Sequence, residues 1–185
     1  MSEAKEGKAF IKHEFDEAIA VQRAIVEAER ILREAHPMAE AKTAIRKLMK
    51  TDEQTLEQLE TLGKKFGATG KAEEVAKAMQ ELSSTTNESA AEAPSEAYEA
   101  HAVLLAMVRK QQDSAGAVVK IASELGDTEV KTAATDMQRA SKQGAEELST
   151  LLSKLAVDIA TDGKSTGSKS TGAKSTGSKA TATSR

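Results

Sequence analysis

Apolar residues recur at every third or fourth position over four long stretches of the chain, which is the spacing of one face of an α-helix. The series after Pro37 is especially regular, and it includes Ala41, Ile45, Leu48, Leu59 and Leu62. This pattern predicts helices over about residues 10–35, 38–66, 96–125 and 130–160, with a shorter helix over about 72–82.

Turn signals divide the four long helices into two pairs. Pro37 separates the first pair, and the sequence GDTE at 126–129 separates the second, with Thr128 as the expected N-cap. The polar segment SSTTNESAAEAPS at 83–95 is predicted to be a loop, so a connection of about 27 residues joins the two hairpins. We therefore expect an all-α four-helix bundle with one long crossover. The alternative is a simple bundle with the short helix packed outside it.

Each apolar series is interrupted by small or polar residues near the middle of its helix. At about 1.5 Å per residue, the interruptions lie roughly 20–26 Å from the turn of their own hairpin. Because all four helices share this feature, we expect one buried polar layer across the bundle, held by hydrogen bonds and trapped water. Its members are Gln22, Asp52, Thr55, Gln111, Ser141 and Gly144.

Two segments resemble the ferritin-like and rubrerythrin-like proteins. The sequence LGDTEVKTAATDMQRASKQGAEELSTLL at 125–152 is similar to the last hairpin of that superfamily, where a Gly-Asp turn leads to a helix that bears Glu-x-x-His. The sequence TDEQTLEQLETL at 51–62 is similar to the partner copy of that motif. The resemblance covers most of residues 10–160 and implies the ferritin-like crossover topology.

The resemblance also implies a place for two metal ions, held by two Glu-x-x-His pairs and a Glu from each remaining helix. The first pair falls on Asp52 and Thr55, and the second on Ser141 and Gly144. The remaining ligand positions fall near Gln22 or Glu29 and near Gln111 or Gln112. Both motif histidines are missing, so we expect no di-iron centre, no other metal and no cofactor. A single weakly bound hard cation or a small ligand in the layer is the alternative.

Composition supports an all-helical protein and excludes several kinds of chemistry. Aromatic residues make up 2% of the chain, Trp and Cys are absent, and 30% of the residues are charged. Without Cys, neither disulfides nor thiolate metal sites can form. The sequence contains neither a secretion signal nor a long apolar run, so we expect a cytoplasmic protein with no membrane association.

The C-terminal segment differs from the rest of the chain in charge and composition. Residues 163–185 carry a net charge of +5, which leaves −8 on residues 1–162. We expect a flexible N-terminus over 1–9, the bundle over 10–161 and a disordered low-complexity tail over 162–185. The tail is either a flexible terminus or a weak polyanion-binding segment. Its candidate contacts are Lys164, Lys169, Lys174, Lys179 and Arg185.

Other candidate sites have simpler interpretations. His13 precedes Asp16 and Glu17 at helical spacing, which suits a surface ion pair, and His36 beside Pro37 is expected to be solvated. The less favoured interpretation is a metal site in which His101 and Glu96 or Glu99 join His13 and its neighbouring acids. The sequence GKKFGATGK at 63–71 is interpreted as a helix C-cap and a loop, because its spacing does not match a phosphate-binding loop.

The sequence thus favours a non-catalytic helical bundle that acts as an interaction or scaffold module. Self-association or a protein partner is expected, because Ala-rich helices bury little apolar area alone. Two alternatives stay open: a nucleoid-type DNA-binding protein that uses the basic tails of an oligomer, and an iron-binding oxidoreductase with a divergent metal site. A less favoured fourth option is an amphipathic granule-associated or stress-associated protein.

Overall fold

The computed structural model describes the backbone of residues 2–165 and the side chains of residues 7–161. Five α-helices account for most of this part of the chain. They are α1 (Ser2–Ala35), α2 (Ala39–Lys65), α3 (Glu74–Ser89), α4 (Pro94–Leu125) and α5 (Thr128–Ser165). No strand occurs within this range, which confirms the prediction of an all-α chain. Over the same residues, none of the helices has the length and apolar character needed to cross a membrane.

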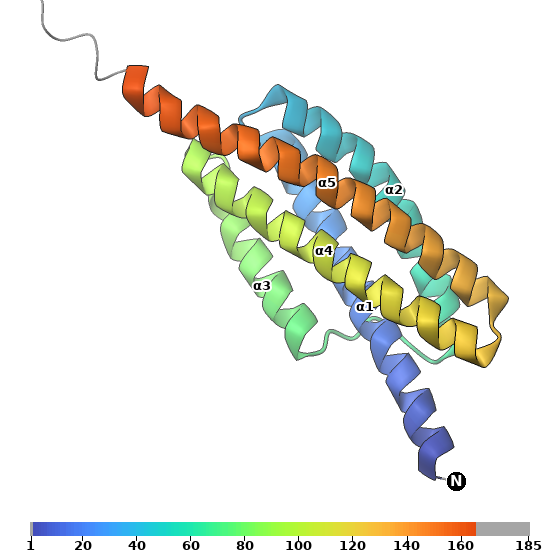
Figure 1. Ribbon diagram of the computed structural model, residues 1–185. Helices are drawn as coiled ribbons and strands as arrows, with labels where there is room; N and C mark the ends of the chain where they lie inside the picture. Colours follow the sequence, from blue (N-terminus) through green and yellow to red (C-terminus); the bar gives the residue numbers. More distant parts are fainter. Residues whose placement is uncertain (1, 166–185) are drawn as a thin grey trace, which may run out of the picture.

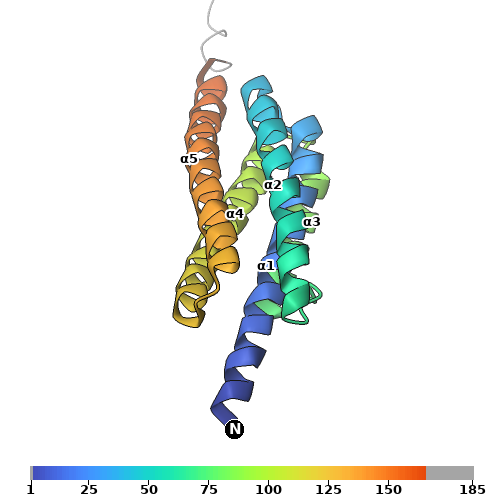
Figure 2. The same ribbon diagram turned by 90° about the vertical axis from the view of Figure 1, so that its right-hand side faces the viewer.

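The four long helices make a closed ring of contacts, in which α1 packs on α2, α2 on α5, α5 on α4, and α4 on α1. Helix α3 lies outside this ring and packs on α1 and α4 (Figure 1). Helices α2 and α4 run in the same direction, because α3 returns the chain between them (Figures 1 and 2). The first turns of α1 project beyond the other helices (Figure 2).

Helix α3 is longer than the sequence predicted, and the expected loop over 83–95 is wrong in its first half. The helix continues to Ser89 through a run of hydroxyl residues. Two causes are visible: Ser83 and Asn87 are buried and bonded to each other, and the hydroxyls of Thr85 and Thr86 donate to carbonyl oxygens one turn back. Tertiary burial therefore outweighs the weak helix propensity of these residues.

Three other boundaries also differ from the prediction. Helix α1 begins at Ser2 instead of near residue 10, so residues 2–9 are helical, in line with their Ala, Glu and Lys content. Helix α5 continues to Ser165 instead of ending near residue 160. Asp127, not Thr128, caps α5, because its Oδ1 accepts the N–H of Val130 at 3.0 Å.

The apolar core consists of two clusters at different heights along the helices. The cluster nearer the α1–α2 turn includes Ile25, Leu32, Ile45, Leu104 and Leu148. The cluster nearer the α4–α5 turn includes Phe15, Ile19, Leu59, Val118 and Met137. On α2, α4 and α5 the predicted polar positions fall between the residues of these two clusters, and on α1 Gln22 lies just beyond the point where the clusters meet.

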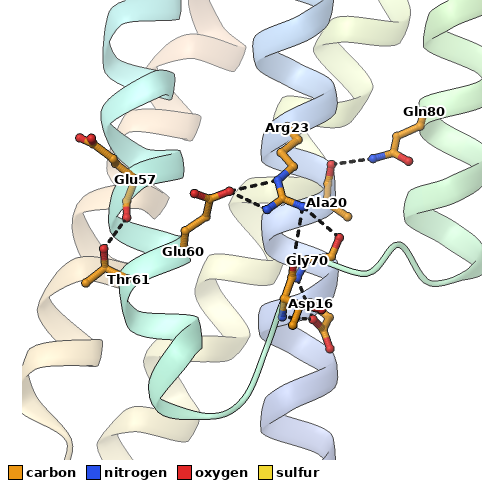
Figure 3. Close-up of polar contacts among 9 residues, drawn as sticks. Asp16, Ala20, Arg23, Glu57, Glu60, Thr61, Gly70 and Gln80 are labelled. Carbon is orange, nitrogen blue, oxygen red and sulfur yellow. Dashed lines mark hydrogen bonds and ion pairs between the residues drawn. The ribbon is translucent and has the colours of Figure 1, made fainter.

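The connection from α2 to α3 is fixed to α1 by a buried carboxylate and an arginine (Figure 3). One oxygen of Asp16 accepts the N–H of Thr69 at 2.7 Å and that of Gly70 at 2.8 Å. Arg23 pairs with Glu60 and also donates to the carbonyl oxygens of Thr69 and Gly70. The segment 66–73 is thus a helix end followed by a loop, as the sequence predicted, and Gly70 takes the left-handed conformation that suits glycine (φ 72°).

Candidate functional site

The polar layer contains a chain of hydrogen bonds that joins α2, α1 and α4. Nε2 of Gln22 donates to Oδ1 of Asp52 at 2.8 Å. Nε2 of Gln111 donates to Oε1 of Gln22 at 3.0 Å and lies 3.1 Å from the carbonyl oxygen of Ala18. Gln22 and Gln111 are fully buried. Because the NH2 group of each amide has a fixed partner, the chain sets the register of the three helices, although Oε1 of Gln111 is buried without a hydrogen-bond partner.

The remaining predicted members of the layer do not join this chain. Thr55 is buried, but its hydroxyl donates to the carbonyl oxygen of Thr51 on its own helix. Ser141 is buried without contributing to the chain, and the sulfur of Met137 on α5 lies 3.4 Å from Nε2 of Gln111.

Packing at Gly144 leaves room for a methyl group, because a Cβ atom there would lie 3.4 Å from Cδ2 of Leu48 and 3.7 Å from Cγ1 of Val108. These are close to ordinary contact distances, so Gly144→Ala should raise the free energy of unfolding by about 0.5–1 kcal/mol through better helix propensity. Thermal unfolding measures the gain. Gly63→Ala is the control, and its free energy of unfolding should not rise, because the added Cβ would lie only 2.9 Å from Cδ1 of Ile19. A destabilised Gly144→Ala protein would contradict this account of the packing.

A carboxyl pair, formed by Glu29 and the half-buried Asp52, lies beside the chain, where α1 meets α2. Glu29 is fully buried, and both of its carboxyl oxygens lack a hydrogen-bond donor. Burial, aided by the nearby Asp52 carboxylate, raises the pKa of Glu29 to about 10. Burial also raises the pKa of Asp52, although the hydrogen bond from Gln22 opposes this shift. At neutral pH Glu29 therefore holds a proton, which it can share with Asp52.

Two buried histidines form a second polar chain near the α1–α2 turn, which we call the histidine chain. The N–H of Met38 donates to Nδ1 of His36 at 3.1 Å, and Nε2 of His36 lies 3.1 Å from Nδ1 of His101. Nε2 of His101 lies 2.9 Å from the carbonyl oxygen of Leu148. Burial lowers the pKa of His36 to about 4 and also lowers the pKa of His101. Both rings are therefore neutral at physiological pH.

The prediction that His36 is solvated is wrong, because the ring has an exposed fraction of 0%. The ring satisfies both of its nitrogens inside the protein, which removes the cost of burying them. His101 fills a core position on α4 and does not pair with Glu96 or Glu99, both of which are exposed. His13 does form the predicted pair on one helix, with its Nε2 3.5 Å from Oε2 of Glu17.

Among the described side chains, no group of three or more His, Asp or Glu is arranged to hold a metal ion. Of the predicted tail contacts, Lys164 belongs to α5, while Lys169, Lys174, Lys179 and Arg185 lie outside the described residues, so their role stays a prediction.

No family model matches this chain, and no curated protein matches its sequence.

Proposed function

We propose that this protein is a non-catalytic, ferritin-like four-helix bundle that serves as an interaction or scaffold module, without a functional di-iron centre. The parallel course of α2 and α4, with α3 returning between them, supports the ferritin-like topology (Figure 1). The ring of contacts among α1, α2, α5 and α4 supports the same assignment.

The observation that carries the proposal is the chemistry of the layer between the two apolar clusters. A di-iron site requires carboxylates and imidazoles from all four helices. Here α4 contributes the amide of Gln111, which is bonded to Gln22, and α5 contributes Ser141 and Gly144. The carboxyl groups of the layer, Glu29 and Asp52, lie together at the α1–α2 contact. Such a layer serves to align helices, and it lacks the charge that two iron ions require.

Exposed apolar side chains support a role in association with another protein chain. Phe10 of α1 is 53% exposed, and Val75 and Leu82 of α3 are 51% and 55% exposed. An open groove of about 660 Å³ between α2 and α5, lined in part by Ala39 and Leu151, adds to the accessible apolar surface. We expect self-association, because a second copy would bury part of this surface.

Metal analysis and native mass measurement on one preparation test this proposal. After incubation with iron(II) under argon and gel filtration, we expect far less than one iron per chain and a mass above that of a monomer. About two bound irons per chain, with iron-dependent oxygen consumption, would overturn the non-catalytic assignment. A strictly monomeric mass over the micromolar range would contradict self-association.

A further inference from the structure

The histidine chain connects the two hairpins of the protein at one end. His36 lies between α1 and α2, His101 belongs to α4, and Leu148 belongs to α5. We propose that the histidine chain is an acid-sensitive latch: protonation of either ring breaks the chain and releases the α4–α5 hairpin from the α1–α2 hairpin at this end. The device is independent of the scaffold role proposed above.

The direction of the hydrogen bonds follows from the two ends of the chain. The backbone N–H of Met38 can only donate, so Nδ1 of His36 must be an unprotonated acceptor. The carbonyl oxygen of Leu148 can only accept, so Nε2 of His101 must carry a proton. The contact between the rings is then a bond from Nε2–H of His36 to Nδ1 of His101.

A further proton on either ring puts two donors face to face. Protonated at Nδ1, His36 points a second N–H at the N–H of Met38, 3.1 Å away. Protonated at Nδ1, His101 faces the Nε2–H of His36 at 3.1 Å. Both arrangements also place a charge in a fully buried position. The contact must open for the charged ring to reach water.

The groups around the rings do not favour the charged form. From α2, the positive charge of Lys42 acts on His36, and from α4 the other ring, His101, does the same. Lys42 itself donates to the carbonyl oxygen of Glu34 on α1. Helix α5 presents the Leu148 carbonyl oxygen to His101, and its Lys154 is paired with Glu40. Among the described residues, no carboxylate forms an ion pair with either ring.

The open and closed states therefore differ in proton affinity over a defined pH range. A solvated histidine has a pKa of about 6.5, whereas the closed chain holds the pKa of His36 at about 4. Stability at this end falls as the pH decreases from about 6.5 to 4, because the open state binds more protons. Glu29 keeps its proton throughout this range, and the pKa of Asp16 lies below its ordinary value.

The test uses the full chain and its third histidine as a matched control. His13→Gln removes a histidine ring outside the latch and should leave acid opening unchanged. His36→Asn with His101→Gln removes both buried rings but keeps an acceptor for Met38 and a donor for Leu148. Hydrogen exchange by mass spectrometry between pH 7.5 and 4.5, corrected for intrinsic rates, gives the opening of each segment. Tyr98, the single tyrosine, lies one helical turn from His101, so its fluorescence reports opening of the structure at this position.

In the wild type and in His13→Gln, the protection of backbone amides from hydrogen exchange should fall about tenfold for each pH unit below 6.5. This should be seen over residues 36–40, 97–104 and 145–152. In the double variant, protection should not change over this range. Equal acid opening in the double variant would overturn the proposal. So would ordinary pKa values near 6.5 for both rings of the His13→Gln protein by NMR, a measurement that does not require the double variant to fold.

Discussion

Replacing Glu29 with Gln should raise the free energy of unfolding at pH 7 by about 3 kcal/mol. The carboxyl group is fully buried and its pKa is raised to about 10, whereas the unfolded chain ionises near 4.5. At pH 7 the folded protein must hold a proton that the unfolded chain has released. This costs about 1.4 kcal/mol for each pH unit above 4.5. Glutamine keeps the shape and offers N–H donors to Asp52 without this cost.

The pH dependence gives the sign of the effect. Because the folded pKa is the higher one, the contribution of Glu29 to stability is fully present below pH 4.5 and is lost as the pH rises toward 10. The Glu29→Gln protein should lack this loss, so urea denaturation at pH 5, 7 and 9 should show the two proteins diverging. Glu27→Gln, at an exposed position of the same helix, is the control. A Glu29→Gln protein less stable than wild type at pH 9 would contradict the protonated state of Glu29.

Replacing Asp16 with Ala should lower the free energy of unfolding by about 3 kcal/mol, because two backbone N–H groups lose a charged acceptor. These are the N–H groups of Thr69 and Gly70, and Asp16 is itself almost fully buried. Hydrogen exchange should accelerate over 66–73 more than elsewhere. Asp113→Ala, on the exposed face of α4, is the control for loss of a carboxylate.

Asp16→Asn separates the role of the acceptor oxygen from the role of charge. Burial alone would raise the pKa of Asp16, but hydrogen bonds from Lys12, Thr69 and Gly70 lower it below 3.8. The stabilisation is therefore present at neutral pH and is lost only below pH 3.8. Asparagine retains one acceptor oxygen, so it should cost less than alanine. Equal stability of all three proteins would show that the connection does not depend on Asp16.

The periodicity of the sequence predicted the long helices because their apolar faces are continuous. Pro37 and the GDTE turn carry local conformational signals, so both hairpin turns lie where the sequence places them. The polar interruptions predicted buried positions for Gln22, Gln111 and Ser141, and these residues are buried. Periodicity could not reveal which of these residues bond to one another, because the pairing depends on side-chain directions across helices.

The residues that the sequence interpretation missed depend on partners distant along the chain. His36 looked like a turn residue, and its partner His101 is 65 positions away. Asp16 looked like part of a surface cluster, yet its acceptor role depends on backbone groups 53 and 54 positions away. A weak signal did exist for the pair: His101 occupies an apolar position of its helical series. A buried histidine in such a series needs a hydrogen-bond partner, so its presence predicts a second buried polar group nearby.

The separation between bonded residues also orders the events of folding. Hydrogen bonds within the first hairpin and its connection join residues up to 54 positions apart, as in Gln22–Asp52 and Asp16–Gly70. Bonds from α1 and its turn to α4 join residues 65 to 93 positions apart, as in His36–His101 and Gln111–Ala18. The N-terminal hairpin, complete after about residue 70, can therefore assemble during synthesis and act as the template on which α4 and α5 later dock.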